Sequence, residues 1–325
     1  MRDAILEFFK KNEGKFVSGQ EIADASGVSR TAIWKHIQTL RTRGYKIESY
    51  TKKGYRLLES PDLLSPLEME NLLSTHYMGR SYRYVERIDS TNILAKKIAQ
   101  EGAKEGTVVV AEEQTGGKGR INRGWSSPYG KGIWFSVVLK PPFPPYEAPK
   151  CTLMAAVALV KAFRAVGMDT AGIKWPNDIL VGSKKLVGIL TEMQASMEAI
   201  HYIVIGMGIN VSVTQDDLPE AVKDIATSFK MEGVEVSRRQ LFAVILDYLE
   251  KQYEKVLDEG FESTLAEWRE LSVTLGKEVQ VKELDHTYTG FAEDIDKDGS
   301  LLVRLPNGDI SRVIAGDVSI RPVNP

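Results

Sequence analysis

Apolar residues in the first 45 positions recur every three or four residues, a spacing that places them on one side of a helix. This spacing covers residues 2–12, a short stretch after Ser18, and the stretch between Ser29 and Gly44. Ser18 begins a capping-box pattern, Ser29 is a second helix cap, and Gly44 supplies a left-handed stop. The pattern therefore predicts three helices in succession.

After Gly44 the spacing changes to that of short strands. Runs at 45–50 and 55–58 flank a polar segment that suits a hairpin turn. Three helices followed by a two-stranded wing form the order of a winged helix-turn-helix, which we predict for residues 1–60. A second capping-box pattern at Ser65 predicts that the next domain begins there.

Residues 65–271 are predicted to form a larger α+β domain. Strand-like runs occur at 82–88, 107–112, 133–139, 173–175, 179–181, 186–191 and 202–209. Helical spacing occurs near 91–101, 149–166, 237–258 and 262–271. This order, with several hairpins and few crossovers, favours a mixed sheet over a doubly wound parallel sheet. From Gly276 onward, short alternating strands separated by turns predict a small β-barrel, which we place at residues 272–325.

Composition adds an uneven distribution of charge to this picture. The chain has 325 residues, of which 43% are apolar and 26% charged, so it is not disordered as a whole. Residues 1–60 contain twelve Lys and Arg against seven Asp and Glu, whereas the remainder contains thirty against thirty-seven. A basic N-terminal domain therefore precedes a mildly acidic body.

The single cysteine, Cys151, lies in an apolar helical run, so we expect it to pack in the core of a protein from a reducing compartment. The longest apolar stretches are shorter than the roughly 18 residues needed to span a bilayer. We therefore expect a cytoplasmic protein with no membrane anchor.

The segment most informative about chemistry is the loop at residues 114–125. Its glycines let backbone N–H groups approach an anion, and Lys118, Arg120 and Arg123 bring three cations to the same loop. It is not a P-loop, because Gly119 follows the lysine where Ser or Thr is required. A solvated surface loop is the alternative, but the extent of the cluster favours a phosphate site.

Two further clusters carry candidate ligands. Lys185 stands at the mouth of an apolar strand, where it can neutralise a carboxylate, and Gly188 lets a ligand lie against the backbone. Asn177 and Asp178 are either turn formers or, for Asp178, a Mg²⁺ ligand beside a phosphate site. A solvated turn lysine remains the alternative for Lys185.

Residues 89–92 open a predicted helix, where two hydroxyls and free N–H groups can hold a small polar group, although helix capping alone also explains them. Residues 206–210 suggest a dinucleotide fingerprint, but Val211 replaces its third glycine and no helix follows. Asn210 remains a candidate nucleotide contact.

In this order, these segments resemble the biotin protein ligases, specifically the bifunctional bacterial class that also represses the biotin operon. That family shows a Gly-Arg-Gly-Arg-x-x-Arg-x-Trp loop, then Lys-Trp-Pro-Asn-Asp, Lys-Leu-x-Gly-Ile-Leu and Gly-x-Gly-Ile-Asn, and the match spans essentially the whole chain. One departure is Lys118, which stands where the family usually has arginine, so the charge is kept but the bidentate fork is lost. The resemblance implies a central domain of the biotin/lipoate ligase type and an SH3-like C-terminal barrel.

The resemblance also implies an activity. ATP would activate biotin as biotinyl-5'-AMP with Mg²⁺ as cofactor, and biotin would pass to a lysine of the biotin carboxyl carrier protein. The implied catalytic residues are Lys185 and Arg120, and Asp178 would lie near the magnesium. The implied biotin-binding residues are Ser90, Thr91, Gln114, Gly117, Lys118, Arg120, Lys185 and Gly188. The implied ATP-binding residues are Lys118, Arg120, Arg123, Trp125, Asn177 and Asn210.

The N-terminal domain is predicted to bind operator DNA. Residues 29–56 contain eight basic residues against the single acidic residue Glu48. The predicted contacts lie at the start of the recognition helix and at the wing tip, and are Ser29, Arg30, Thr31, Lys35, Lys52 and Lys53. The resemblance further implies a homodimer that forms when biotinyl-5'-AMP binds as co-repressor.

Three other functions remain open from the sequence. A lipoate ligase shares the chemistry, but its usual Arg-Arg-x-x-Gly-Gly-Gly signature is absent. A pure transcription factor would sense a metabolite without turnover. A ligase whose winged helix no longer reads DNA is the third. Biotin-dependent exchange of pyrophosphate into ATP separates an enzyme from a sensor.

Overall fold

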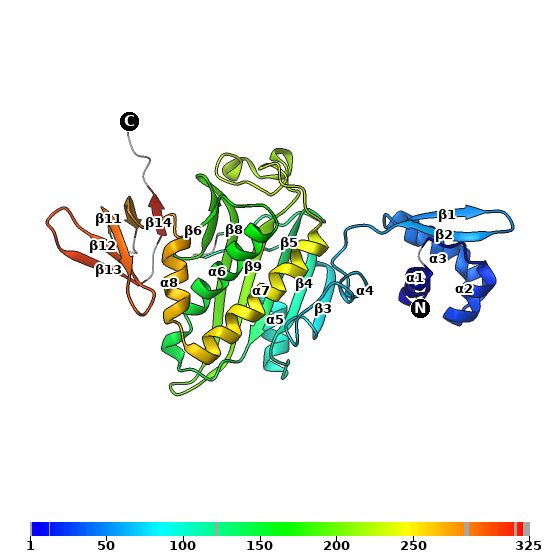
Figure 1. Ribbon diagram of the computed structural model, residues 1–325, viewed down its shortest axis with the longest axis horizontal. Helices are drawn as coiled ribbons and strands as arrows, with labels where there is room; N and C mark the ends of the chain where they lie inside the picture. The colour runs from blue at the N-terminus through cyan, green and yellow to red at the C-terminus, as the bar shows by residue number, and fades with distance from the viewer. Residues whose placement is uncertain (1, 13, 121–122, 283–285, 315–316, 321–325) are drawn as a thin grey trace. The chain divides into compact units, whose positions relative to one another are not determined.

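The computed structural model describes residues 2–12, 14–120, 123–282, 286–314 and 317–320. The chain forms two compact units, residues 1–71 and 72–325, and each is considered by itself (Figure 1). No helix in the described ranges is long and apolar enough to cross a membrane.

The N-terminal unit is the predicted winged helix-turn-helix. Its elements are α1 (Arg2–Lys11), α2 (Gly19–Ser26), α3 (Arg30–Thr42), β1 (Lys46–Tyr50) and β2 (Gly54–Glu59). The strands pair as an antiparallel hairpin, and the apolar faces of the three helices meet in one core. The capping box at Ser18 forms as predicted, because its hydroxyl accepts a hydrogen bond from Glu21 N at 3.1 Å while its own N–H donates to the Glu21 carboxylate at 2.7 Å.

The second predicted capping box, at Ser65, is wrong. The helix that follows, α4 (Pro66–Met69), has only four residues, and Ser65 makes no side-chain cap. Glu68 is instead buried, where it pairs with Lys10 Nζ at 2.9 Å and accepts a hydrogen bond from the Tyr45 hydroxyl at 3.3 Å. These contacts explain why α4 belongs to the N-terminal unit and does not open the next domain.

A seven-stranded sheet organises the second unit, in the order β3-β4-β5-β9-β8-β7-β6. Its strands are β3 (Tyr82–Ile88), β4 (Thr107–Gln114), β5 (Gly132–Leu139), β6 (Ala171–Lys174), β7 (Asp178–Val181), β8 (Lys184–Ala195) and β9 (Ile200–Asn210). Among these seven strands only β3 and β4 pair in parallel, which confirms a mixed α+β sheet. All seven predicted strands are present.

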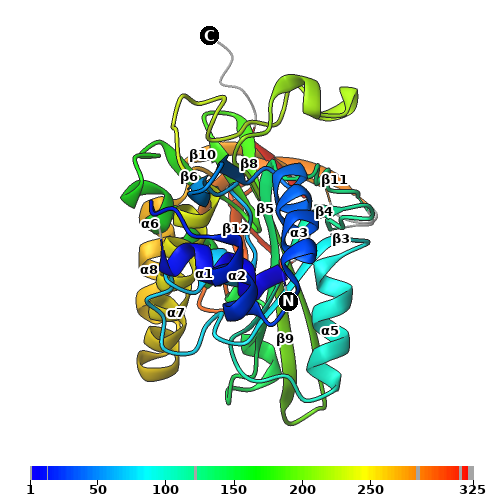
Figure 2. The same ribbon diagram turned by 90° about the vertical axis from the view of Figure 1, so that its right-hand side faces the viewer.

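Helices cover both faces of this sheet. The helices are α5 (Thr91–Gln100), α6 (Lys150–Ala165), α7 (Arg238–Glu259) and α8 (Glu262–Leu271). Figure 2 shows α5 on one face and α6, α7 and α8 on the other. Short 3₁₀ turns lie at Pro145–Glu147, Gln215–Asp217 and Glu220–Val222. Cys151 is buried in α6 as predicted, and burial raises the pKa of its thiol above the ordinary range.

The last segment forms the small β domain predicted from its alternating strands. It is a five-stranded antiparallel sheet in the order β13-β12-β11-β10-β14. Its strands are β10 (Lys277–Lys282), β11 (Thr287–Ile295), β12 (Leu301–Arg304), β13 (Ile310–Val313) and β14 (Asp317–Ile320). The turn between β11 and β12 lies against α6 and the segment that follows β6.

Candidate active site

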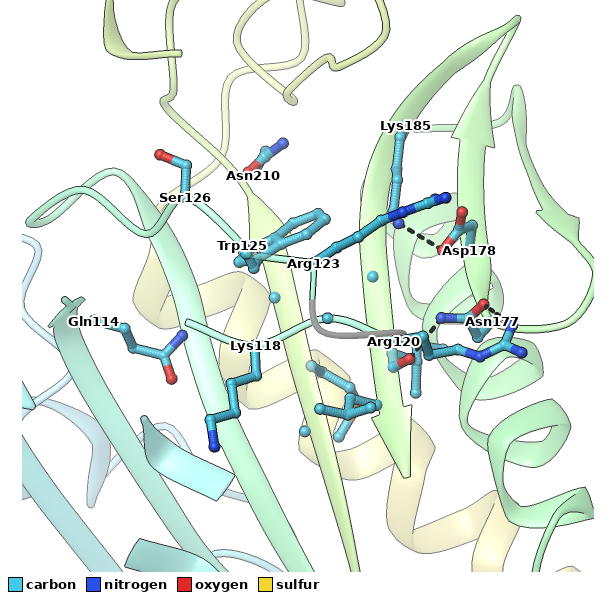
Figure 3. Close-up of a pocket in the computed structure, with 18 of the residues that line it drawn as sticks. Gln114, Lys118, Arg120, Arg123, Trp125, Ser126, Asn177, Asp178, Lys185 and Asn210 are labelled. Atoms are coloured by element: carbon cyan, nitrogen blue, oxygen red, sulfur yellow. Dashed lines mark hydrogen bonds and ion pairs between the residues drawn. The ribbon is translucent and has the colours of Figure 1, made fainter. Parts of the chain in front are cut away.

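A pocket opens between the start of α5, the loop that follows β4, and the β7, β8 and β9 strands (Figure 3). It is lined by almost all of the residues predicted to bind a small molecule. These are Ser90, Thr91, Gln114, Lys118, Arg120, Arg123, Trp125, Asn177, Asp178, Lys185, Gly188 and Asn210. Of the predicted set, only Gly117 does not line the pocket, so segments far apart in sequence do meet at one site.

One end of the pocket is neutral and fixed by hydrogen bonds. Gln114 Oε1 accepts from the Thr91 backbone N–H at 2.8 Å and from the Thr91 hydroxyl at 3.1 Å. Gln114 Nε2 donates to Ser127 Oγ at 3.0 Å, and the hydroxyl oxygens of Thr91 and Ser136 lie 2.8 Å apart. Ser90 makes no side-chain cap on α5, so capping does not account for this segment. The network presents preset donors and acceptors to an uncharged polar group.

Asn92 has a part in this end of the site that the sequence did not reveal. Its Oδ1 accepts from Ser136 Oγ at 2.6 Å, and its Nδ2 donates to Glu192 at 2.9 Å. A Cβ at Gly206 would lie 1.9 Å from Asn92 Oδ1, so only glycine lets α5 approach β9 this closely. Asn92 was part of the candidate segment 89–92, but that segment has the sequence pattern of an ordinary helix N-terminus, so a role for this asparagine could not be singled out.

The ring of Trp125 covers the middle of the pocket wall. Cβ atoms built at Gly188 and Gly208 would lie 2.9 Å and 2.3 Å from ring atoms of Trp125. These two glycines face each other across β8 and β9, so together they form a flat seat for the ring. Lys185 Nζ lies 5.2 Å from the ring centroid, within range of a cation–π interaction. In this structure Gly188 therefore admits a side chain of the protein itself.

The opposite end of the pocket is ionic. Lys185 Nζ pairs with an Asp178 carboxylate oxygen at 2.7 Å. The backbone of Lys185 is held on both sides, because its N–H donates to Ile225 O at 2.7 Å and its carbonyl accepts from Thr227 N at 2.9 Å. The cation is thus fixed at the mouth of β8, as the sequence predicted.

Two arginines of the loop share this end. Arg120 Nη1 donates to Asn177 Oδ1 at 3.1 Å, and Asn177 Nδ2 donates in turn to Ile189 O at 2.8 Å. In Figure 3 the Arg123 side chain extends toward the side occupied by Lys185 and Asp178. Three cations therefore lie at the end remote from Thr91 and Gln114.

Lys118 lies apart from these three cations. Figure 3 shows its side chain directed away from Lys185. Burial opposes ionisation of Glu192, but hydrogen bonds from Lys96 and Asn92 and the charges of Lys96 and Lys118 outweigh it and lower the pKa of that carboxyl. The charge of Lys118 thus contributes to the electrostatics at Glu192, and its side chain does not point toward Lys185.

Two of the predicted residues affect the shape of the site. Gly117 acts through the backbone of the loop, and Asn210 acts through the wall of the pocket. A Cβ at Gly117 would lie 2.3 Å from Trp125 O, and Trp125 N donates to Gly117 O at 2.8 Å. Gly117 therefore lets the loop fold back on itself. Asn210 is buried at the end of β9 and donates to Thr227 O at 2.9 Å, which anchors the segment that closes the pocket wall near Ala226.

Three parts of the chain match known families. Residues 2–56 match the HTH domain, residues 84–210 the biotin/lipoate A/B protein ligase family, and residues 274–321 the biotin protein ligase C-terminal domain. Over 321 residues the chain is 41% identical to the bifunctional ligase/repressor BirA of Bacillus spizizenii, with 98% of each chain covered. The chain belongs to the bifunctional ligase/repressor family of biotin protein ligases.

Two further comparisons agree with this family. The ligase/repressor is 34% identical to a biotin–[acetyl-CoA-carboxylase] ligase of Mycobacterium tuberculosis, over 79% of this chain and 97% of that protein. A solved structure of the Aquifex aeolicus biotin protein ligase in complex with biotin and ATP superposes with a TM-score of 0.64 at 26% identity, covering 74% of this chain and 99% of that one. The full-length match supports a ligase with a helix-turn-helix domain over a lipoate ligase or a sensor without turnover.

The predicted DNA-binding residues of this ligase/repressor lie on α3 and on the wing. Ser29 Oγ accepts from Ala32 N at 3.3 Å and caps α3. All six predicted residues are exposed, namely Ser29, Arg30, Thr31, Lys35, Lys52 and Lys53. A hollow between α3 and the wing is lined by Arg30, Gln38 and Lys52, and also by Trp34, which is 57% exposed and had no predicted role. One basic surface of the N-terminal unit is thus formed by the helix and the hairpin together.

Proposed function

We propose that the pocket binds biotin and ATP together and joins them as biotinyl-5'-AMP. The observation that carries this proposal is the division of a single pocket into a neutral end at Thr91 and Gln114 and a cationic end at Lys185, Arg120 and Arg123. The uncharged ureido ring of biotin suits the neutral end, and its carboxylate and the phosphates suit the cationic end. The Aquifex aeolicus complex with biotin and ATP supports the assignment.

The reaction brings two anions together. A carboxylate oxygen of biotin attacks the α-phosphorus of ATP, the bond to the bridging oxygen breaks, and pyrophosphate leaves. Lys185 neutralises the approaching carboxylate and the charge that grows on the α-phosphate, and the arginines hold phosphate oxygens. A lysine amine of the biotin carboxyl carrier protein then attacks the acyl carbon, loses a proton, and releases AMP. No covalent enzyme nucleophile is required.

Magnesium fits this site as a companion of the nucleotide. Asp178 is the only carboxylate among the residues that line the pocket, and the described residues contain no group of three that could hold a metal ion alone. Mg²⁺ commonly binds through one or two carboxylates together with substrate phosphates. When bound, the ion would neutralise phosphate charge, with Asp178 as its protein ligand.

Substrate choice gives the direct test of the enzymatic proposal. We expect the chain to exchange labelled pyrophosphate into ATP when biotin is present, because adenylate formation is reversible. Lipoate should support little exchange, since it lacks the ureido group that the Thr91 and Gln114 network suits. Equal exchange with lipoate would contradict the biotin assignment, and no exchange with either acid would reject adenylation.

The N-terminal unit makes the second part of the proposal. We assign to it the binding of operator DNA of biotin genes through α3 and the wing. Exposed Arg and Lys side chains of both elements lie in or beside one hollow. We further propose that the protein works in the cytoplasm, where both the carrier protein and the operator are present.

Biotinyl-5'-AMP should also promote a homodimer that binds the operator. One winged helix reads a short half-site, and two linked copies gain affinity through effective concentration. By linkage, dimerisation must tighten adenylate binding by the factor with which the adenylate favours the dimer, commonly about 5–150-fold. Sedimentation equilibrium with and without a non-hydrolysable adenylate analogue measures the factor, and an unchanged dimer constant would exclude the coupling.

A further inference from the structure

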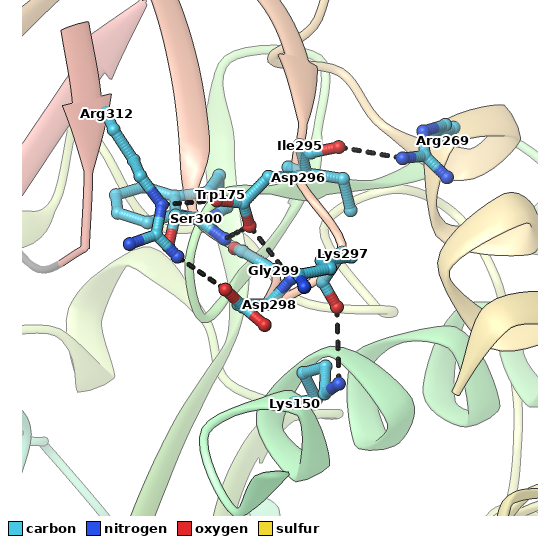
Figure 4. Close-up of polar contacts among 10 residues, drawn as sticks. All are labelled: Lys150, Trp175, Arg269, Ile295, Asp296, Lys297, Asp298, Gly299, Ser300 and Arg312. Carbon is cyan, nitrogen blue, oxygen red and sulfur yellow. Dashed lines mark hydrogen bonds and ion pairs between the residues drawn. The ribbon is translucent and has the colours of Figure 1, made fainter. Parts of the chain in front are cut away.

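The turn between β11 and β12, residues 296–300, touches the segment that carries Asn177 and Asp178 into the pocket (Figure 4). Trp175 Nε1 donates to Gly299 O at 3.0 Å, and the Trp175 backbone N–H donates to Thr274 Oγ1 at 2.9 Å. Trp175 itself is only 2% exposed. Both of these hydrogen bonds join the segment that follows β6 to the C-terminal domain.

Contacts within the turn and with Arg312 hold the turn in the conformation that accepts the N–H of the Trp175 indole. Asp296 Oδ1 accepts from the N–H groups of Asp298 and Ser300, each at 2.9 Å. Arg312 braces the outside of the turn by pairing with Asp296 and, at 2.7 Å, with Asp298. These contacts fix the direction of the Gly299 carbonyl before any ligand binds.

The turn is also anchored to α6. Lys150 is buried at the start of the helix, and its Nζ donates to Lys297 O at 3.2 Å. Gly299 has a φ of +82°, and a Cβ there would lie 2.7 Å from Leu153 Cδ1. The turn therefore packs directly on the helix, and a side chain at Gly299 would strain the backbone and force Leu153 to shift.

On its other side, the Trp175 segment holds the loop arginine. Asn177 follows Trp175 by two residues, and its backbone carbonyl and side-chain amide both bond to Ile189, at 3.0 Å and 2.8 Å. The remaining polar atom of its side chain, Oδ1, accepts from Arg120 at 3.1 Å. A continuous series of contacts thus runs from Gly299 through Trp175 and Asn177 to Arg120.

A second cavity lies along this series. It is lined by Trp175, Asn177 and Arg120 on the ligase side and by residues 298–300 and Arg312 on the side of the C-terminal domain. Arg120 and Asn177 line the active-site pocket as well. The β11–β12 turn is therefore one residue layer away from the cationic end of the active site.

We propose that the β11–β12 turn is a positioning element of the ligase site, and that Trp175 and Gly299 are positioning residues for the ATP-binding end. The proposal rests on the ATP-dependent function assigned above. Loss of the Trp175–Gly299 hydrogen bond should let Asn177 and Arg120 shift, which weakens the hold on phosphate. Biotin binding should be affected less, because the neutral end at Thr91 and Gln114 is fixed by β4, β5 and α5, and Lys185, which neutralises the carboxylate, is held by Ile225 and Thr227.

The test is Trp175→Phe, which removes the indole N–H and keeps an aromatic ring. We expect the KM for ATP in pyrophosphate exchange to rise about tenfold, the size of one buried hydrogen bond. The Kd for biotin, measured by calorimetry without ATP, should change less than about twofold. A general loss of packing would change both the KM for ATP and the Kd for biotin. A larger change in the KM for ATP than in the Kd for biotin therefore indicates a positioning role at the ATP-binding end.

Trp268→Phe is the matched control. Trp268 is also buried, but its Nε1 has no hydrogen-bond partner within the described part of the chain, so the same substitution removes no such bond. Its KM for ATP should stay near that of the parent chain. Arg312→Gln, on the exposed side of the turn, should raise the KM for ATP in the same direction by a smaller factor and does not threaten folding.

Three outcomes overturn the inference. They are an unchanged KM for ATP in a folded Trp175→Phe variant, equal losses of ATP and biotin binding, and an equal effect of Trp268→Phe. If Trp175→Phe does not fold, an unchanged KM for ATP in Arg312→Gln overturns it. Exchange by the parent chain is the reference, so its absence would reject the proposed function, whereas normal parent activity with unaffected variants would reject only the positioning role.

Discussion

Lys185→Met should lower the rate of biotin-dependent pyrophosphate exchange by about a thousandfold, the upper range for loss of one preorganised charge at a transition state. Methionine has similar length but cannot neutralise the two anions that meet at β8. The change also leaves the Asp178 carboxylate, now 2.7 Å from the ammonium group, without its partner beside the phosphates. Both effects oppose the reaction, and neither disturbs the backbone bonds of residue 185.

The neighbouring lysine supplies the control. Lys184 starts the same strand but does not line the pocket, so Lys184→Met should retain exchange within about twofold. Circular dichroism and thermal unfolding of both variants establish that the fold is intact. Exchange by a folded Lys185→Met chain at more than a tenth of the parent rate would remove Lys185 from the catalytic role.

Removal of residues 1–71 should abolish specific operator binding while the ligase reaction largely survives. The first effect follows because α3, the wing and their basic side chains all lie in this unit. The second follows because every residue that lines the active-site pocket lies in the other unit. Gel-shift assays with promoter DNA of biotin genes and pyrophosphate exchange measure the two activities on the same preparation.

The position of the cut is itself informative. A cut after residue 62, between the predicted domains 1–60 and 65–271, would leave Glu68 without Lys10 and Tyr45. That shorter truncation should therefore retain an α4 segment that has lost these two contacts, and it should bring no gain in activity over removal of 1–71. Specific operator binding by either truncated chain would place the DNA-reading surface outside the N-terminal unit.

Local periodicity was sufficient for most of the fold. Strands such as β5 and β9 are continuous apolar runs, and helices such as α6 show a repeated apolar face, so neighbouring residues alone specify them. The Ser65 pattern failed because a four-residue pattern carries no information about distant partners. Glu68 could have capped the N-terminus of its own helix or paired with the ammonium group of Lys10. It pairs with Lys10, because it is buried in the N-terminal unit.

The candidate site was likewise predicted only in part. The residue types of the glycine-rich loop and of Lys185 favoured an anion site, while a solvated surface loop and a solvated turn lysine stayed open as alternatives. The directions of side chains did not follow from the sequence. Lys118 is directed away from Lys185 (Figure 3), and the Trp175 indole donates to a turn more than 120 positions away, because both orientations depend on tertiary contacts. The role of Asn92 likewise depends on the bare backbone of Gly206.

The seat of Trp125 on Gly188 and Gly208 has a consequence for how this chain can change over evolutionary time. Any side chain at either glycine would have to displace the ring, since Cβ atoms there would already lie 2.9 Å and 2.3 Å from it. A smaller residue at position 125 would relieve that constraint at both positions at once. Substitutions at 188 and 208 should therefore be tolerated only in lineages that have first lost the tryptophan, so the order of mutations, and not only their identity, is restricted at this point of the sheet.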